Sequence, residues 1–253
     1  ALTGSWKWCA PARSRSPVVT SDALLGALER GIAKGRRTLV SVTAAVEVED
    51  PCATIFGARL ASDRWFCWEQ PDRDFAFAGM GVAREASGRG AERFAEVAAA
   101  AGETGRDAVL DEPRGLPAGA GPVWLGGFAF DPEGGGSATW SSFEPGSLFL
   151  PEVSICRRGE DCFLTVNAVV GPGEDAERRA AELGARLSGL RTDAALPLLD
   201  PHPTSRPTIR SARPPRTFED AVERATARIA AGEMQKVVLA REVIVTSASA
   251  HDP

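Results

Sequence analysis

Residues 152–170, EVSICRRGEDCFLTVNAVV, constrain the fold more than any other stretch of the sequence. Two runs of alternating apolar and polar residues flank a central RGED, and this pattern predicts a β-hairpin. Further runs rich in β-branched and aromatic residues occur at 38–48, 64–70, 74–83 and 122–132. We therefore expect antiparallel strands, the first three of these runs forming a meander.

Helical patterns alternate with these runs. The first begins at Ser21 or Asp22 as the N-cap, and its leucines recur with the spacing of a buried helix face. The last begins at Thr217, which forms a capping-box-like pair with Asp220, and ends at Gly232. The predicted helices cover residues 21–35, 90–103, 174–190 and 217–231. Helices mixed with antiparallel strands predict an α+β fold, in which a layered antiparallel sheet carries the helices.

Three parts follow from the composition along the chain. Residues 1–190 hold most of the predicted elements and form one α+β part. Residues 191–216 contain six of the 18 prolines and show no periodicity, so we expect a linker or a surface excursion there. Residues 217–253 contain the last helix and a predicted strand at 236–248.

Composition and motifs exclude several classes of function. A net charge of −5 gives no broad attraction for nucleic acid or an anionic membrane, and no apolar run approaches the ~20 residues of a membrane span. Only His202 and His251 are present, both in loop-like sequence, which argues against histidine triads and histidine-rich metal sites. The glycine clusters at 78–83 and 126–136 lack the spacing of phosphate-binding loops, so we expect bulges, bends or close backbone approach there.

The cysteines indicate a reducing compartment. They are odd in number and form no CxxC motif, so free thiols in a cytoplasmic protein fit best. A pairing of Cys156 with Cys162 across the predicted hairpin turn is the alternative. The five are Cys9, Cys52, Cys67, Cys156 and Cys162.

Lys236 is the candidate catalytic residue, and two interpretations of it stand. A lysine just beyond a helix usually interacts with the exposed carbonyls at the helix end. The alternative is a lysine packed against apolar strand neighbours, since desolvation lowers the pKa of a lysine and lets the neutral amine act as a base. Periodicity alone does not decide between them.

Several stretches carry a resemblance in order along the chain. They are RWFCWEQPDRDFAFAGMGVA (64–83), WLGGFAFDP (124–132), WSSFEPGSLFLPEV (140–153) and FEDAVERATARIAAGEMQKVVLARE (218–242). Together they resemble the chorismate-utilising enzymes, and within them the isochorismate synthases of menaquinone and siderophore pathways. The resemblance implies the α+β fold of that family, with residues 1–190 as scaffold and 217–253 as the start of the chorismate-binding region.

The same resemblance implies a reaction. Lys236 matches the lysine that activates water for attack at C2 of chorismate, while an acid assists departure of the C4 hydroxyl and Mg²⁺ holds the substrate carboxylate. Lysine rather than glutamine at this position favours water over ammonia as the nucleophile. Only Lys236 carries over, since the acid, the Mg²⁺ ligands and the substrate-binding residues are expected beyond Pro253.

We therefore expect a fragment of an isochorismate synthase, incomplete at its C-terminal end and inactive alone. Its small-molecule partner is chorismate, with no nucleic acid and no membrane. Salicylate synthase, which goes on to eliminate pyruvate, is one alternative. A non-catalytic scaffold or binding module that keeps half of the fold is the other.

Overall fold

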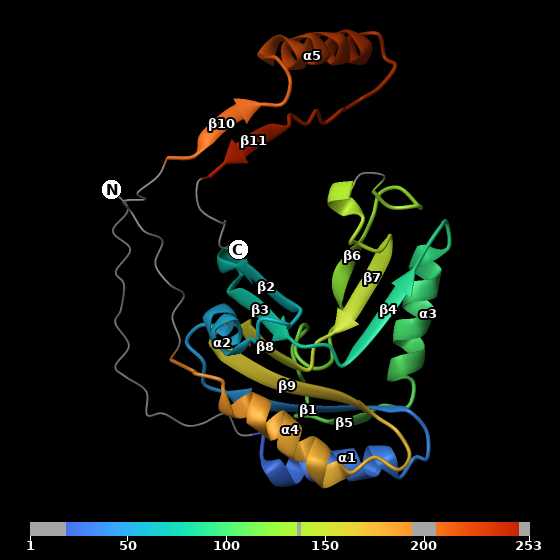
Figure 1. Cartoon of the computed structure of the whole chain (residues 1–253), viewed down its shortest axis with the longest axis vertical. Coiled ribbons are helices and arrows are strands. Elements are labelled where there is room, and N and C mark those ends of the chain that lie inside the picture. The colour runs from blue at the N-terminus through green and yellow to red at the C-terminus, as the bar shows by residue number, and fades with distance from the viewer. Residues whose placement is uncertain (1–18, 136–137, 194–205, 248–253) are drawn as a thin grey trace. The chain divides into compact units, whose positions relative to one another are not determined.

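The structure of the chain is a computed structural model that describes residues 19–135, 138–193 and 206–247 (Figure 1). It divides into two compact units, 1–196 and 197–253, which are described separately. None of the described helices is long and apolar enough to cross a membrane. Cys9, His202 and His251 lie outside the described residues.

A six-stranded sheet forms the centre of the first unit, in the order β2-β3-β8-β9-β1-β5. All neighbours are antiparallel except β1 and β5. The hairpin prediction is confirmed, because β8 and β9 pair from Arg158 opposite Asp161. The strands are β1 (Thr38–Val46), β2 (Trp65–Gln70), β3 (Phe75–Met80), β5 (Val109–Asp111), β8 (Val153–Arg158) and β9 (Asp161–Val170).

The predicted meander is wrong for the first of its three runs. β2 and β3 do pair, but β1 pairs with β9 and β5 instead of β2. The physical reason is a short helix, α2 (Pro51–Ala58), which the sequence did not predict. Asp50 caps it by accepting a hydrogen bond from the Ala53 N–H at 2.9 Å. Pro51 occupies the first helical position, where the backbone N–H that proline lacks would have no partner within the helix. The Asp-Pro pair that looked like a strand break therefore begins a helix.

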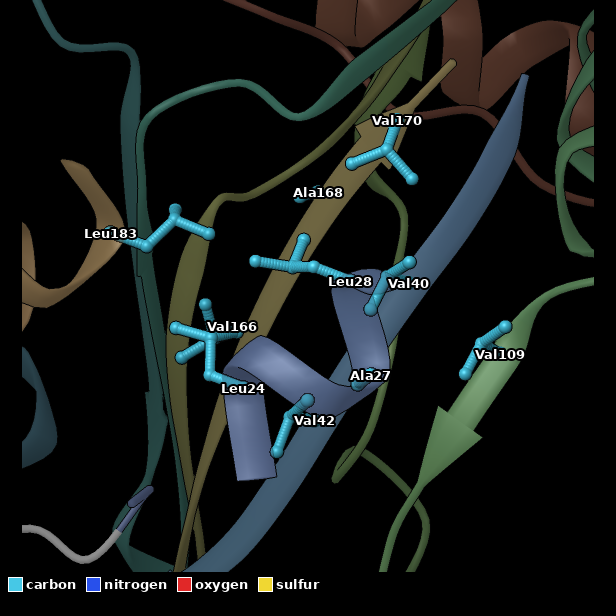
Figure 2. Close-up of a cluster of buried hydrophobic side chains, with 10 residues drawn as sticks. All are labelled: Leu24, Ala27, Leu28, Val40, Val42, Val109, Val166, Ala168, Val170 and Leu183. Atoms are coloured by element: carbon cyan, nitrogen blue, oxygen red, sulfur yellow. The ribbon is translucent and has the colours of Figure 1, made fainter. Parts of the chain in front are cut away.

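Helices α1 (Ser21–Ile32) and α4 (Ala176–Ser188) lie side by side over one face of this sheet (Figure 1). Leu24 and Leu28 point from α1 into a buried cluster with Val40 of β1, Val166 of β9 and Leu183 of α4 (Figure 2). The N-cap of α1 is Thr20, one residue before the predicted Ser21 or Asp22.

Helix α2 covers the same face near β2 and β3. Its Cys52 and Ile55 pack with Ala78, Met80 and Leu164. Leu164 is two residues from Val166, and alternate residues of a strand share one face. One apolar layer therefore runs under α1, α4 and α2 and forms the core of the unit.

A second sheet contains three strands in the order β4-β7-β6, and helix α3 packs against it. The predicted run 122–132 contains β6, while β4 and β7 of this sheet, and β5 of the first sheet, lie in no predicted run. The elements are β4 (Arg84–Gly88), α3 (Arg93–Gly105), β6 (Leu125–Phe128) and β7 (Gly146–Leu150), with short 3₁₀ turns η1 (Pro71–Arg73) and η2 (Ala138–Trp140).

The second unit contains two short antiparallel strands, β10 (Thr208–Ser211) and β11 (Val243–Thr246), and the helix α5 (Pro215–Ala230). Two predictions are corrected here. The helix begins at Pro215, inside the predicted linker, with Pro214 as its N-cap and no side-chain cap, so the Thr217–Asp220 pair does not form one. The predicted strand 236–248 is paired only over 243–246, because β10 offers four residues as its partner.

Candidate functional site

Lys236 lies between α5 and β11, in a segment that is neither helix nor strand. Its side chain is exposed and makes no hydrogen bond or ion pair with any residue that the structure describes. The apolar neighbours Val237 and Val238 are also open to solvent, at 40% and 81% exposure. The expected apolar surroundings of Lys236 are therefore not supplied by the described residues.

The C-terminal end of α5 is closed without Lys236. Gly232 adopts the left-handed conformation with φ of 73°, and its N–H donates to the carbonyl of Ile229 at 3.0 Å. The N–H of Glu233 donates to the carbonyl of Arg228 at 3.0 Å. These two bonds form a Schellman motif, which satisfies the last helical carbonyls. Gly232 thus ends the helix as predicted, and Lys236 is not a capping charge in this structure.

A cavity of about 480 Å³ lies within the second unit, between the N-terminal end of α5 and the segment that leads into β11. Its cationic groups are Arg213 and Arg241, and the Nε of Arg241 donates to Ser211 Oγ at 3.0 Å. Lys236 does not line this cavity. Phe218 lines it from α5 and is half-buried.

A larger cavity of about 930 Å³ lies in the first unit, over β6 and β7. Six aromatic side chains line it, while Arg64, Glu85 and Ser147 are among the residues that supply polar atoms. Arg64 donates to Glu85 at 2.7 Å, and Ser147 Oγ donates to the same carboxylate at 3.1 Å. The hydrogen bond from Arg64 lowers the pKa of Glu85, so this carboxylate stays charged. The aromatic residues are Phe66, Phe128, Phe130, Trp140, Phe143 and Phe149.

Arg93 holds one wall of this cavity and was not predicted from the sequence. The residue is 5% exposed, and its guanidinium donates to the carbonyls of Gly90, Ala129 and Phe130 at 2.9, 3.1 and 3.3 Å. The guanidinium also lies 4.4 Å from the ring centre of Phe94. No periodicity marks such a residue, because an arginine in a helical pattern normally faces solvent.

The part of the chain that the structure describes contains one group of three side chains able to hold a metal, formed by Asp50, Cys52 and Glu69. The group does not suit Mg²⁺, which takes oxygen ligands in octahedral geometry, because Cys52 offers a thiol. The sequence prediction placed the Mg²⁺ ligands elsewhere, and the described residues give no oxygen site for the ion.

Comparison with known proteins identifies the family. A family model described as "Chorismate binding enzyme" matches residues 26–253, which is nearly the whole chain and includes Lys236. The chain belongs to the chorismate-binding enzymes. The resemblance noted in the sequence is thereby confirmed, together with the α+β class of the fold.

Two curated relatives, both named isochorismate synthases, are similar to the chain over most of its length. One is isochorismate synthase MenF of Bacillus subtilis, 29% identical over 231 residues, covering 88% of this chain and 48% of the relative. The other is the salicylate biosynthesis isochorismate synthase of Pseudomonas aeruginosa, 33% identical over 226 residues, covering 87% of this chain and 45% of the relative. The chain thus spans about half the length of the curated relatives that it matches.

A solved structure shows the same fold. It is MenF, the menaquinone-specific isochorismate synthase from Escherichia coli, with a TM-score of 0.50 and 19% identity. The match covers 88% of this chain and 46% of that one. This solved isochorismate synthase therefore shares the fold of the chain.

The free thiols expected from the sequence are present at all four described cysteines. Cys156 faces Phe163 across the β8–β9 hairpin, while Cys162 faces Arg157. The alternative pairing of Cys156 with Cys162 is thus not formed. Burial raises the pKa of the Cys156 thiol to about 11 and keeps it protonated at neutral pH.

Proposed function

We propose that this chain is part of an isochorismate synthase in which Lys236 is the base. The observation that carries the proposal is the family match over residues 26–253 together with two relatives that are both named isochorismate synthases. In the proposed reaction a water molecule loses a proton to the Lys236 amine, and its oxygen bonds to C2 of chorismate. The double bonds shift and the C4 hydroxyl leaves with a proton from an acid, so the atoms of substrate and product balance.

The exposure of Lys236 bears on whether residues 1–253 are active alone. A lysine acts as a base only as the neutral amine, a form that apolar burial favours. The described residues leave Lys236 exposed, with Val238 beside it 81% exposed. We therefore propose that residues 1–253 alone do not convert chorismate, and that burial of Lys236 by further polypeptide is required.

The proposal also assigns a role to each of the three parts of the chain. Residues 1–190 act as scaffold, 191–216 as the connection, and 217–253 begin the chorismate-binding region. Residues outside those that the structure describes would hold Mg²⁺, which would bind the substrate carboxylate. A cytoplasmic location agrees with the four free thiols.

The product distinguishes the proposal from its alternatives. The protein from the complete reading frame, incubated with chorismate and Mg²⁺, is expected to form isochorismate without salicylate or pyruvate. Salicylate with pyruvate would indicate a salicylate synthase, for which the name of the Pseudomonas aeruginosa relative gives a reason to test. Binding without turnover would indicate the scaffold or binding module.

A further inference from the structure

Cys52, in the first turn of α2, and Cys67, on β2, meet at the edge of the six-stranded sheet. The Cys67 sulfur lies 3.8 Å from the carbonyl oxygen of Cys52. The Cys52 sulfur lies 3.9 Å from the carbonyl oxygen of Phe77. Phe77 precedes Ala78, the residue that pairs with Cys67 across β2 and β3. The two sulfurs therefore lie over the same part of the β2–β3 ladder, although they belong to different elements.

The two thiols differ in exposure, and this difference assigns a role to each. Cys52 is 3% exposed, whereas Cys67 is only half-buried and is accessible from solvent. The thiols share a hydrogen bond, which lowers the pKa of Cys67 and raises the pKa of Cys52. An accessible thiol beside a second, protected thiol is the arrangement in which one cysteine is oxidised and the other resolves it.

The charges around the pair select the class of oxidant. One oxygen of Asp50 and one oxygen of Glu69 lie within 4.8 Å of the Cys52 sulfur. These carboxylates repel an anionic oxidant such as oxidised glutathione, and the burial of Cys52 keeps any large oxidant away from its sulfur. Hydrogen peroxide is both neutral and small, so the site admits it.

We propose that Cys67 is an oxidation site for hydrogen peroxide and that Cys52 resolves it to a disulfide. The Cys67 thiolate attacks one peroxide oxygen, so an S–O bond forms, the O–O bond breaks and the leaving hydroxide takes up a proton to become water. The Cys52 sulfur then attacks the sulfur of the Cys67 sulfenic acid. An S–S bond forms, the S–O bond breaks, and the hydroxyl leaves with the Cys52 proton as a second water. In total the two thiols lose two hydrogens and two electrons to the peroxide.

The disulfide joins α2 to β2, the outer strand of the six-stranded sheet. A dithiol reductant reverses it by thiol–disulfide exchange and returns both cysteines to thiols, the form in which the structure describes them. The inference does not rest on the proposed isochorismate synthase activity, because it concerns two thiols that the proposed reaction does not use.

Peptide mapping of the 253-residue chain tests the site. The reduced, folded chain is exposed to hydrogen peroxide, its remaining thiols are alkylated, and it is then digested with trypsin. Cleavage after arginine places Cys52 on the peptide 38–59 and Cys67 on the peptide 65–73. We expect these two peptides to be recovered linked, with a mass two hydrogens below their sum, and to separate on reduction. Oxidised glutathione at the same concentration is expected to give less of the linked product.

Three variants assign the roles within the pair. Cys52→Ser removes the resolving thiol, so Cys67 is expected to stop at the sulfenic acid, which dimedone labels on the peptide 65–73. Cys67→Ser is expected to give neither the linked peptides nor dimedone labelling of Cys52. Cys156→Ser is the matched control, since it removes a buried thiol next to Ile155 and therefore on the face of the sheet opposite to α2. This control is expected to form the linked peptides as the wild type does.

Four results would overturn the proposal. One is a wild-type chain that gives no linked peptides, and another is a wild-type Cys67 recovered as sulfinic acid beside an unreacted Cys52. A third is dimedone labelling of Cys52 in the Cys67→Ser chain, which would reverse the roles. The last is equal linkage by oxidised glutathione, which would contradict the class of oxidant. If a cysteine variant does not fold, the peptide map of the wild-type chain decides by itself.

Discussion

Arg228 and Glu233 form an ion pair at 2.7 Å across the C-terminal end of α5. Together with the left-handed Gly232, this pair closes the helix three residues before Lys236. Lys236 is consequently left exposed and unpaired among the described residues, with no part in the stability of the helix.

The first prediction separates the helix end from Lys236. Gly232→Ala forces a side chain into the left-handed region, so the protection of α5 amides against hydrogen exchange is expected to fall by about 1–2 kcal/mol. Lys236→Ala is expected to leave that protection unchanged. If Lys236→Ala loses as much protection as Gly232→Ala, Lys236 does cap the helix and the prediction is contradicted.

The elements that sequence patterns predicted are those with a strong local signal. The β8–β9 hairpin and the stripe of Leu24 and Leu28 in α1 follow from alternation and helical spacing. The pairing of β1 with β9 joins residues more than a hundred positions apart, and no local pattern encodes it. Helix α2 was missed because Asp50 and Pro51 are common both in turns and at helix starts.

The residues of the candidate site likewise differ in whether the sequence alone predicts them. Lys236 was predicted from the resemblance to a family, because periodicity alone did not decide between a charge at the helix end and a base. The role of Arg93 depends on its guanidinium meeting the backbone carbonyls of Ala129 and Phe130, which lie far along the chain. Such a meeting becomes visible only when the topology is known.

The second prediction concerns the glycines of β6. A Cβ at Gly126 would lie 2.0 Å from the carbonyl oxygen of Ser147, and the φ of this residue is 150°. Gly126→Ala is therefore expected to cost about 2–4 kcal/mol in the free energy of unfolding by urea. A Cβ at the adjacent Gly127 meets nothing within 4 Å, and Gly127→Ala is expected to stay within about 0.5 kcal/mol of the wild type. Equal losses in the two variants would contradict the β6–β7 register.

The third prediction compares two ion pairs of α4. Arg186 meets Asp63 at 2.7 Å with side-chain exposures of only 17% and 12%, while Arg178 meets Glu182 at 3.1 Å with 79% and 45%. Arg186→Met leaves a largely buried carboxylate unpaired and is expected to cost about 2–4 kcal/mol in the free energy of unfolding. Arg178→Met is expected to cost about 0.3–0.5 kcal/mol. A loss in Arg186→Met as small as that in Arg178→Met would show that the pair is solvated.

The fourth prediction is a pH dependence. Arg64 lowers the pKa of Glu85 in the folded chain, so this carboxylate stabilises the fold at a pH above its ordinary value of about 4.3. That contribution is lost as the pH falls from about 4.3 through the lower folded value. Glu85→Gln should therefore flatten the acid side of the stability curve measured by urea unfolding from about pH 7 to about pH 3, a range that includes the ordinary glutamate pKa of about 4.3. The effect is small, because both side chains are more than 40% exposed, and a variant curve parallel to the wild type would contradict it.

The initial rate of isochorismate formation from chorismate, measured with the protein from the complete reading frame, tests the central claim most directly. We expect Lys236→Gln to lower this rate by about 100-fold or more, the usual contribution of a general base. Lys34→Gln, a change at a lysine of the first unit whose amine donates to the carbonyl of Asp107, should keep the rate. A Lys236→Gln enzyme that forms isochorismate at the wild-type rate would contradict the assignment of Lys236 as the base.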